Sequence, residues 1–160
     1  MIYKVQDFPM KRGEAQARCD QDSEDAGVPG FLHLPMPRSD VQNQIYSEII
    51  WNADASQSFG KPTQKGVAWL DIVEVKPSTN PRSWIYNDGS PVTWFNWNEP
   101  AEPNNWGGKE TEVQMYQDPE KYLGMWNDCP KDLNNLVVCT YFLPAGAEND
   151  CTWLHEFEDY

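Results

Sequence analysis

Hydrophobic and polar positions in the first third of the chain follow a helical period. Ala15 and Cys19 lie four residues apart within residues 11–25, which predicts a helix with one buried face. A second and clearer helix is predicted after residue 38, because a capping box is followed by apolar side chains at intervals of four residues. These positions are Ser39 and Gln42 for the box, and Val41, Ile45 and Ile49 for the apolar row.

After residue 50 the pattern changes to short apolar runs separated by turn residues, which is typical of β-strands. The runs are residues 67–70, 84–86 and 92–95. A strong turn signal occupies 87–90, and a long polar loop spans 98–112. Trp126 and the run 136–139 bracket a second loop and a terminal strand. Helices first and strands afterwards predict an α+β domain.

The length and composition fit one folded domain with a polar tail. Of the 160 residues, 39% are hydrophobic and 13% aromatic, including eight Trp, which is enough for one packed core and unlike a disordered chain. We expect residues 1–143 to form this domain and residues 144–160 to form an acidic extension.

The charge excludes several partner classes. Asp and Glu number 25 against 12 Lys and Arg, giving a net charge of −13. Such a chain has no basic stripe for a nucleic-acid backbone and is repelled by anionic membranes. No apolar run approaches the ~18 residues of a spanning helix, so we expect no membrane insertion by this chain.

Four cysteines stand at positions 19, 129, 139 and 151. They form no CxxC pair, and the two His give little support to a zinc finger or a Cys nucleophile. The even count favours disulfides and an oxidising compartment. The N-terminus lacks a secretion signal, which leaves a fragment of an exported protein or a cytosolic protein with reduced thiols. We favour the fragment.

The densest chemistry of the sequence is a group of carboxylates and side-chain amides in the second half of the chain. Hard oxygen ligands on loops suit Ca²⁺, which accepts 6–8 of them at roughly 2.3–2.6 Å. Each residue alone is ordinary in a polar loop, so the hypothesis depends on the whole set. The set is Glu102, Asn104, Glu110, Asn127 and Asp128.

Several short motifs, in their order along the chain, resemble those of the C-type lectin-like domain. They are Trp69-Leu70-Asp71-Ile72, Trp84 with Asp88-Gly89-Ser90, Asn96-Trp97, Glu102-Pro103-Asn104-Asn105, Glu110, and Trp126-Asn127-Asp128. The match runs from about residue 3 to residue 142. The resemblance implies two helices, two small antiparallel sheets and a long loop region that forms a calcium-dependent carbohydrate site.

Position by position, the five oxygen-bearing residues match the protein ligands of the family's sugar-binding calcium. The resemblance also implies a cis peptide bond before Pro103. The order Glu102, Pro103, Asn104 resembles members that prefer equatorial 3- and 4-hydroxyls, as in mannose, N-acetylglucosamine, glucose or fucose-type sugars. Members with Gln and Asp at the two outer positions tend toward galactose, so the resemblance implies mannose-type selectivity.

Trp106 complicates the expected selectivity. It lies two residues after Asn104, and a ring there could stack on a sugar and favour galactose-like shapes, or it could pack against the loop without touching a ligand. Both alternatives stay open, and we take the Glu-Pro-Asn order as the stronger determinant because it sets the hydrogen-bond polarity. Five other tryptophans are expected in the core, namely Trp69, Trp84, Trp94, Trp97 and Trp126.

The cysteines follow the family pattern only in part. Cys19 and Cys139 match the pair that closes the family fold. The second family disulfide is not intact, because its upstream cysteine falls near Glu112 and its downstream one belongs two residues beyond Cys129. We expect Cys129 to pair with Cys151 in the extension, with an intermolecular bond as the alternative.

A second ion is an open question. Glu74 and Asn105 fall near positions of an auxiliary calcium site in the family, but the insertion at 73–83 blurs the register. Asp71 also departs from the family, which usually has Gly at this position.

The leading hypothesis is a non-enzymatic lectin fragment, secreted or on the cell surface, that binds glycans through Ca²⁺. We expect a monovalent affinity around millimolar, so useful avidity requires a homo-oligomer or clustered glycans. The alternatives are the same fold binding galactose-type sugars, or binding a protein or an ice surface. A glycosidase is disfavoured because each clustered carboxylate is accounted for as an ion ligand.

Overall fold

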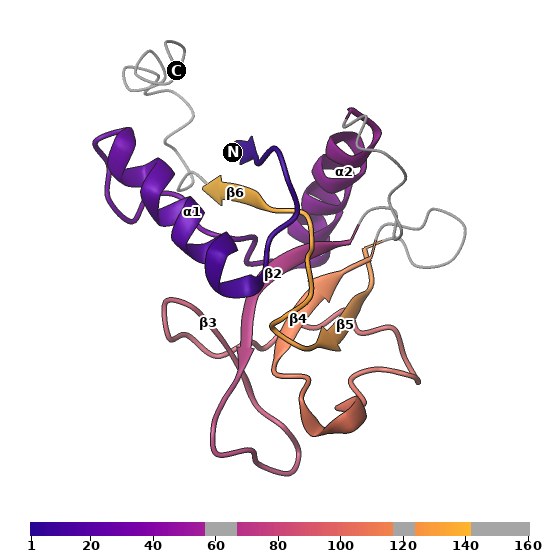
Figure 1. The fold of residues 1–160 in the computed structure, drawn as a ribbon. Helices are drawn as coiled ribbons and strands as arrows, with labels where there is room; N and C mark the ends of the chain where they lie inside the picture. The colour runs from indigo at the N-terminus through magenta and orange to yellow at the C-terminus, as the bar shows by residue number, and fades with distance from the viewer. Residues whose placement is uncertain (57–66, 117–123, 142–160) are drawn as a thin grey trace.

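The computed structural model describes residues 1–56, 67–116 and 124–141, which form two helices and two antiparallel sheets (Figure 1). The helices are α1 (Arg12–Asp25) and α2 (Asp40–Ser56), with a short 3-10 turn η1 (Trp106–Gly108). The strands are β1 (Ile2–Val5), β2 (Ala68–Glu74), β3 (Trp84–Tyr86), β4 (Glu112–Met115), β5 (Trp126–Cys129) and β6 (Val138–Tyr141). One sheet is β1-β6 and the other is β3-β2-β4-β5, so the predicted α+β class is confirmed.

Two expectations fall outside the described residues, namely the acidic extension 144–160 and its Cys151. The division of the chain at residue 143 therefore stays a prediction. Among the helices that the structure describes, none combines the length and apolarity required to cross a bilayer.

Helix α2 forms as predicted, but a different face of it is buried. Val41 is 66% exposed, and the row at intervals of four residues lies along the edge of the core. The buried positions are Asn43, Tyr46, Ser47 and Ile50. Asn43 is tolerated inside because its Oδ1 accepts from Trp126 Nε1 at 2.8 Å and its Nδ2 donates to the Gly124 carbonyl at 3.0 Å.

The strands follow the apolar runs with two corrections. The run at 92–95 is not a strand: only the bridge Pro91–Ile85 and a 2.9 Å bond from the Val92 N–H to the Trp84 carbonyl attach it to β3. Proline has no N–H for a ladder, so the chain leaves the sheet here. The second correction concerns the end of the long loop: the sequence predicts a loop over 98–112, whereas Glu112 is the first residue of β4, which lies between β2 and β5.

The expected tryptophan core is present. Trp69 and Trp126 are fully buried, and Trp126 packs edge-on against Trp94 and Trp97 with ring centroids 5.5 and 5.8 Å apart. The backbone of Trp126 accepts from the Asn98 N–H at 3.0 Å, at the entrance of the long loop. The aromatic layer therefore forms the base from which this loop projects.

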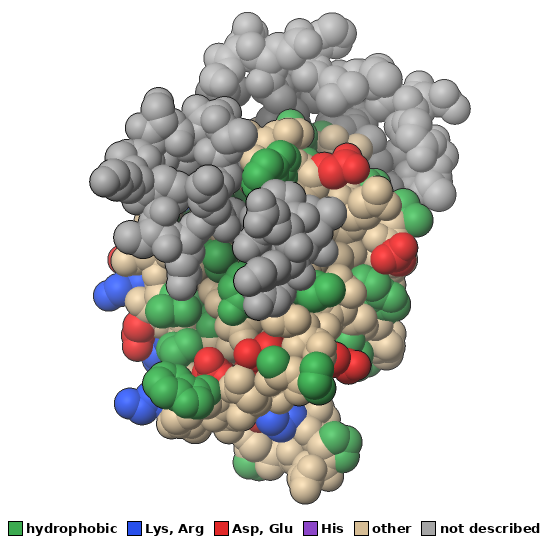
Figure 2. Space-filling model, turned by 90° about the vertical axis from the view of Figure 1, so that its right-hand side faces the viewer, with side chains coloured by type: hydrophobic (Ala, Val, Ile, Leu, Met, Phe, Trp, Pro, Cys, Tyr) green, Lys and Arg blue, Asp and Glu red, His purple; other side chains and the backbone are tan. Residues whose placement is uncertain are grey.

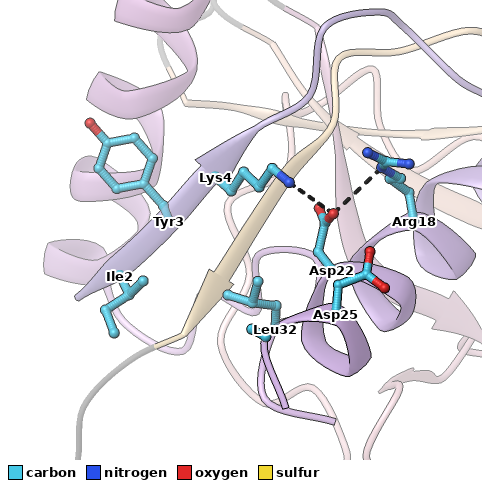
Figure 3. Close-up of a pocket in the computed structure, with 8 residues that line it drawn as sticks. Ile2, Tyr3, Lys4, Arg18, Asp22, Asp25 and Leu32 are labelled. Carbon is cyan, nitrogen blue, oxygen red and sulfur yellow. Dashed lines mark hydrogen bonds and ion pairs between the residues drawn. The ribbon is translucent and has the colours of Figure 1, made fainter. Parts of the chain in front are cut away.

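The opposite end of the molecule is closed by the predicted Cys19–Cys139 disulfide between α1 and β6. With a sequence separation of 120 residues, this cross-link contributes about 4–5 kcal/mol in the chain-entropy model. Beside it, the carboxylate of Asp22 receives Lys4 at 2.8 Å and Arg18 at 3.6 Å. Figure 3 shows these two cations converging on Asp22, which ties β1 to α1.

A buried ion cluster stands near the place of the missing family disulfide. Glu112 of β4 pairs directly with Cys129 of β5, whose thiol is buried and forms no disulfide with the other described cysteines. Arg12 of α1 reaches between the strands, with Nη2 2.8 Å from Asp71 Oδ1 and Nε 3.5 Å from Glu112 Oε2. The pairing of Cys129 with Cys151 stays a prediction, because Cys151 lies outside the described residues.

Burial raises the pKa of Asp71 from 3.8 to about 7, although the Arg12 guanidinium acts to lower it. Between about pH 4 and pH 7, Asp71 is therefore protonated in the folded protein and ionised in the unfolded chain. Because the folded pKa is raised, this proton contributes its full stabilisation below pH 4. The stabilisation is lost as the pH rises through 7.

We predict that Arg12→Met lowers the free energy of unfolding by about 3–5 kcal/mol at pH 8, where it leaves a buried carboxylate without a counterion. The loss is smaller at pH 5, where Asp71 carries a proton. Urea denaturation at both pH values measures this, with the exposed Lys11→Met as the matched control. An equal or larger loss at pH 5 contradicts the assignment of Arg12 as the counterion.

Candidate metal centre in the long loop

Three carboxylates converge at one point of the long loop. Glu102, Glu110 and Asp128 each offer one oxygen, and these oxygens all lie within 4.8 Å of one another. The first two belong to the loop before β4, and Asp128 belongs to β5. In Figure 1 this loop, marked by the short turn η1, lies at the end of the molecule away from the N-terminus.

Asp128 fastens the loop to the sheet. Its side chain is fully buried, with Oδ1 accepting from the Asn104 N–H at 3.0 Å and Oδ2 accepting from the Asn105 N–H at 2.8 Å. Asn105 has a φ of 49°, in the left-handed region that Asn tolerates better than most residues. Two consecutive N–H groups thereby reach the same carboxylate.

Glu110 fixes the backbone of Trp106. The Trp106 N–H donates to Glu110 Oε2 at 2.6 Å and to Asn104 Oδ1 at 2.8 Å. In return, the Glu110 N–H donates to Asn105 Oδ1 at 3.3 Å. The Trp106 backbone is thus held at the carboxylate group, whereas its side chain is 81% exposed. The Trp106 ring does not pack into the loop.

Glu102 is incompletely satisfied. The peptide bond between Glu102 and Pro103 is cis, as the resemblance implies, and the Asn104 amide donates to Glu102 Oε1 at 3.0 Å. The other oxygen, Oε2, is buried and has no hydrogen-bond partner. Desolvation is the main cause that raises the pKa of Glu102 to about 7, and the neighbouring carboxylates of Asp128 and Glu110 add to this shift.

This donor set fits a calcium ion. Burial, together with the charge of Asp128, also raises the pKa of Glu110. The carboxylates are therefore gathered against their mutual repulsion, which a divalent cation would relieve. The amide of Asn104 adjoins Glu102, and Asn127 precedes Asp128 in β5, where it is buried opposite Gln114. These contacts join four of the five predicted residues, Glu102, Asn104, Glu110 and Asp128. Asn127 is placed near them only as the neighbour of Asp128 on β5.

The place beside Glu74, where the sequence suggests a second calcium ion, holds the positively charged side chain of Arg82. Arg82 Nη2 lies 2.9 Å from Glu74 Oε2, and Arg82 Nη1 lies 2.6 Å from Asp128 Oδ2. Lys76 Nζ lies 3.1 Å from the same Glu74 oxygen. The hydrogen bond from Arg82 is the main cause that lowers the pKa of Glu74 to about 2.

Sequence reasoning missed Arg82, which lies within the 73–83 insertion. The available signal is the register of the sheet. Glu74 of β2 pairs with Trp84 of β3, so Arg82, two residues before Trp84, comes near the carboxylate at the end of β2.

On the face drawn in Figure 2, acidic side chains lie scattered among hydrophobic and neutral ones instead of forming one acidic surface.

Several proteins are similar to this chain in sequence, among them the following three. Pulmonary surfactant-associated protein D of Bos taurus is 27% identical over 128 residues, which are 80% of this chain and 29% of that protein. C-type lectin BML-2 of Bungarus multicinctus is 32% identical over 74 residues, 46% of this chain and 43% of the lectin. A C-type lectin of Cerberus rynchops is 32% identical over 78 residues, 49% and 46% of the two chains. The chain spans less than half the length of these relatives, and no protein-family model matches it.

Solved structures share the fold over most of their length. The carbohydrate-recognition domain of the mouse scavenger receptor C-type lectin superposes with a TM-score of 0.60 at 22% identity, covering 89% of this chain and 91% of that one. C-type lectin CEL-I from Cucumaria echinata gives 0.64 at 20% identity, covering 88% and 90%. The chain has the C-type lectin-like fold.

The C-type lectin-like fold does not by itself specify a ligand. A calcium-independent type II antifreeze protein has a TM-score of 0.59 to this chain at 18% identity, covering 86% of this chain and 82% of the antifreeze protein. The function of this chain must therefore be argued from its loop.

We predict that Asp128→Asn destabilises the protein even when calcium is removed. The amide can present only one oxygen to the donors around it, so the free energy of unfolding falls by about 2–3 kcal/mol. Urea denaturation in excess chelator measures the loss. Asp132 is exposed, so Asp132→Asn is the control. Equal stability of the two variants would contradict the anchoring role of Asp128.

Proposed function

We propose that this C-type lectin-like domain binds carbohydrate through a calcium ion and catalyses no reaction. The observation that carries the proposal is the convergence of three carboxylate oxygens within 4.8 Å, one of the carboxylates having a buried oxygen without a partner. Five residues hold the ion in this proposal, namely Glu102, Asn104, Glu110, Asn127 and Asp128. The bound ion supplies a Lewis-acidic point for two sugar hydroxyls.

The protein side chains then select the sugar through hydrogen bonds. A hydroxyl that gives one lone pair to the ion can accept from an Asn amide with its other lone pair and donate its proton to a carboxylate. Asn104 and Glu102 already lie in hydrogen-bond contact, so both functions are available side by side. The Glu-Pro-Asn order favours equatorial 3- and 4-hydroxyls, and hence termini of the mannose, N-acetylglucosamine, glucose or fucose type.

The exposed Trp106 ring gives the site an apolar neighbour. Its backbone is fixed by Glu110 and Asn104, so the ring stands beside the ion ligands. We infer that it contacts the apolar face of a bound sugar. Galactose-type sugars are the alternative ligand, because a stacking ring at this place suits their shape.

The proposed setting is extracellular or at the cell surface. The relatives named as C-type lectins support the class, and the net charge of −13 suits neutral glycans better than polyanions. Few contacts offset the cost of association with one sugar, so we infer multivalent binding through a homo-oligomer or clustered glycans. We also propose the domain boundary at residue 143 and the Cys129–Cys151 pairing.

A second candidate function is binding of a protein or an ice surface without calcium. The likeness to a calcium-independent antifreeze protein favours it, because that protein shares the fold. The two functions differ in one measurable property: chelation abolishes binding only when the ion belongs to the binding site.

We predict that Ca²⁺ at a hundredfold excess over its Kd stabilises the domain by about 2.7 kcal/mol, or roughly 5–10 °C in Tm. Thermal melting with Ca²⁺ and with excess chelator measures the shift. Glu110→Gln loses most of it, whereas Asp132→Asn keeps it. Identical melting of the parent protein in both buffers would falsify the calcium site.

We predict that the domain prefers mannose to galactose in Ca²⁺ and that Glu102→Gln with Asn104→Asp inverts the preference. The double exchange reverses the donor and acceptor order at the sugar hydroxyls while it keeps the oxygen ligands of the ion. Competition on a glycan array with and without chelator measures both proteins. Trp106→Ala serves as the control, since it removes the ring and leaves the hydrogen-bond polarity intact.

A further inference from the structure

Arg82 lies at the junction of three segments that carry the proposed site. One of its terminal nitrogens, Nη1, bonds Asp128 Oδ2 at 2.6 Å, and the other, Nη2, bonds Glu74 Oε2 at 2.9 Å. The same Nη2 also donates to the Glu110 carbonyl oxygen. The guanidinium therefore connects β2, the long loop and β5.

The position of Arg82 is set by packing as well as by charge. Its guanidinium carbon lies 4.6 Å from the ring centroid of Trp84, and its side chain is only 17% exposed. The two carboxylates that it bridges have fully buried side chains. A guanidinium delivers two fixed donor directions and cannot lose its proton, which suits a permanent bridge between buried anions.

The charges around Arg82 balance with one divalent ion. Glu102, Glu110 and Asp128 carry three negative charges, which Arg82 and a single Ca²⁺ match. Glu74 has Lys76 as a further partner at 3.1 Å. A second divalent ion at this place would face a guanidinium already bonded to the oxygens it needs.

We propose that Arg82 is a positioning residue that acts as a built-in cation, holding Asp128 and Glu74 in place so that the loop binds one calcium ion and not two. This inference rests on the proposed function for the ion itself. The bridge made by Arg82 consists of protein atoms alone, so its effect on the loop is separable from calcium binding.

The test is the number of calcium ions bound by the full 160-residue chain, measured by titration calorimetry and by metal analysis after equilibrium dialysis over 0.1–10 mM Ca²⁺. The parent protein binds one ion. Arg82→Gln exposes the oxygens of Glu74, Asp128 and the Glu110 carbonyl and binds two, whereas Arg82→Lys keeps a positive charge and binds one. The double variant E74Q/R82Q removes the freed carboxylate and returns to one ion.

Arg38 supplies the matched control. It also pairs with a carboxylate, Asp88 at 2.9 Å, and lies 4.2 Å above an aromatic ring, that of Tyr86, but it contacts none of the proposed ion ligands. We expect Arg38→Gln to bind one ion. Two ions bound by the parent protein, or one ion bound by R82Q, overturns the proposal.

A stability measurement in excess chelator separates this inference from the proposed function. We expect R82Q to lower the urea midpoint by about 1 M relative to R38Q, because it leaves two buried carboxylates without their bridge. If the parent protein binds no calcium, the proposed function fails, and the lowered midpoint alone still supports Arg82 as the holder of the loop. Equal midpoints for R82Q and R38Q overturn that role.

Discussion

The carboxylate of Asp128 is the interaction on which the functional end of the molecule depends. It accepts from two consecutive backbone N–H groups of the long loop and from the guanidinium of Arg82. A buried carboxylate requires such donors, because its charge is otherwise too costly to remove from water. Because these donors must lie within hydrogen-bond distance of Asp128, this one side chain on β5 determines the path of the loop. The aromatic layer around Trp126 keeps β5 in place.

Two arginines do similar structural work at two places in the fold. Arg12 joins α1 to Asp71 and Glu112 where the family pattern has a disulfide, and Arg82 joins Glu74 to Asp128 where a second ion was considered. In both cases a guanidinium bridges acidic side chains of different strands. A bridge of this kind depends on solvent exclusion, whereas a covalent bond does not, so local opening affects these links more than the Cys19–Cys139 bond.

The sequence predicted the elements better than their faces. The two helices and the tryptophan core depend on local patterns, the Cys19–Cys139 pair was implied by the family resemblance, and the structure has all of them. The predicted buried face of α2 was wrong, because Asn43 is a core residue only through its hydrogen bonds to Trp126 and Gly124. Arg82 was missed because its contacts depend on the assembled sheet: the pairing of β2 with β3 brings it to Glu74, and Asp128, 46 residues away in sequence, reaches it from β5.

Trp106 has a backbone that is fixed and a ring that faces water. A ligand that covers this ring removes apolar surface from solvent without first having to order the chain that carries it. Covering about half of an indole is worth on the order of 2 kcal/mol. Such adhesion depends on shape and hydration instead of charge, and therefore it persists at ionic strengths that weaken surface ion pairs.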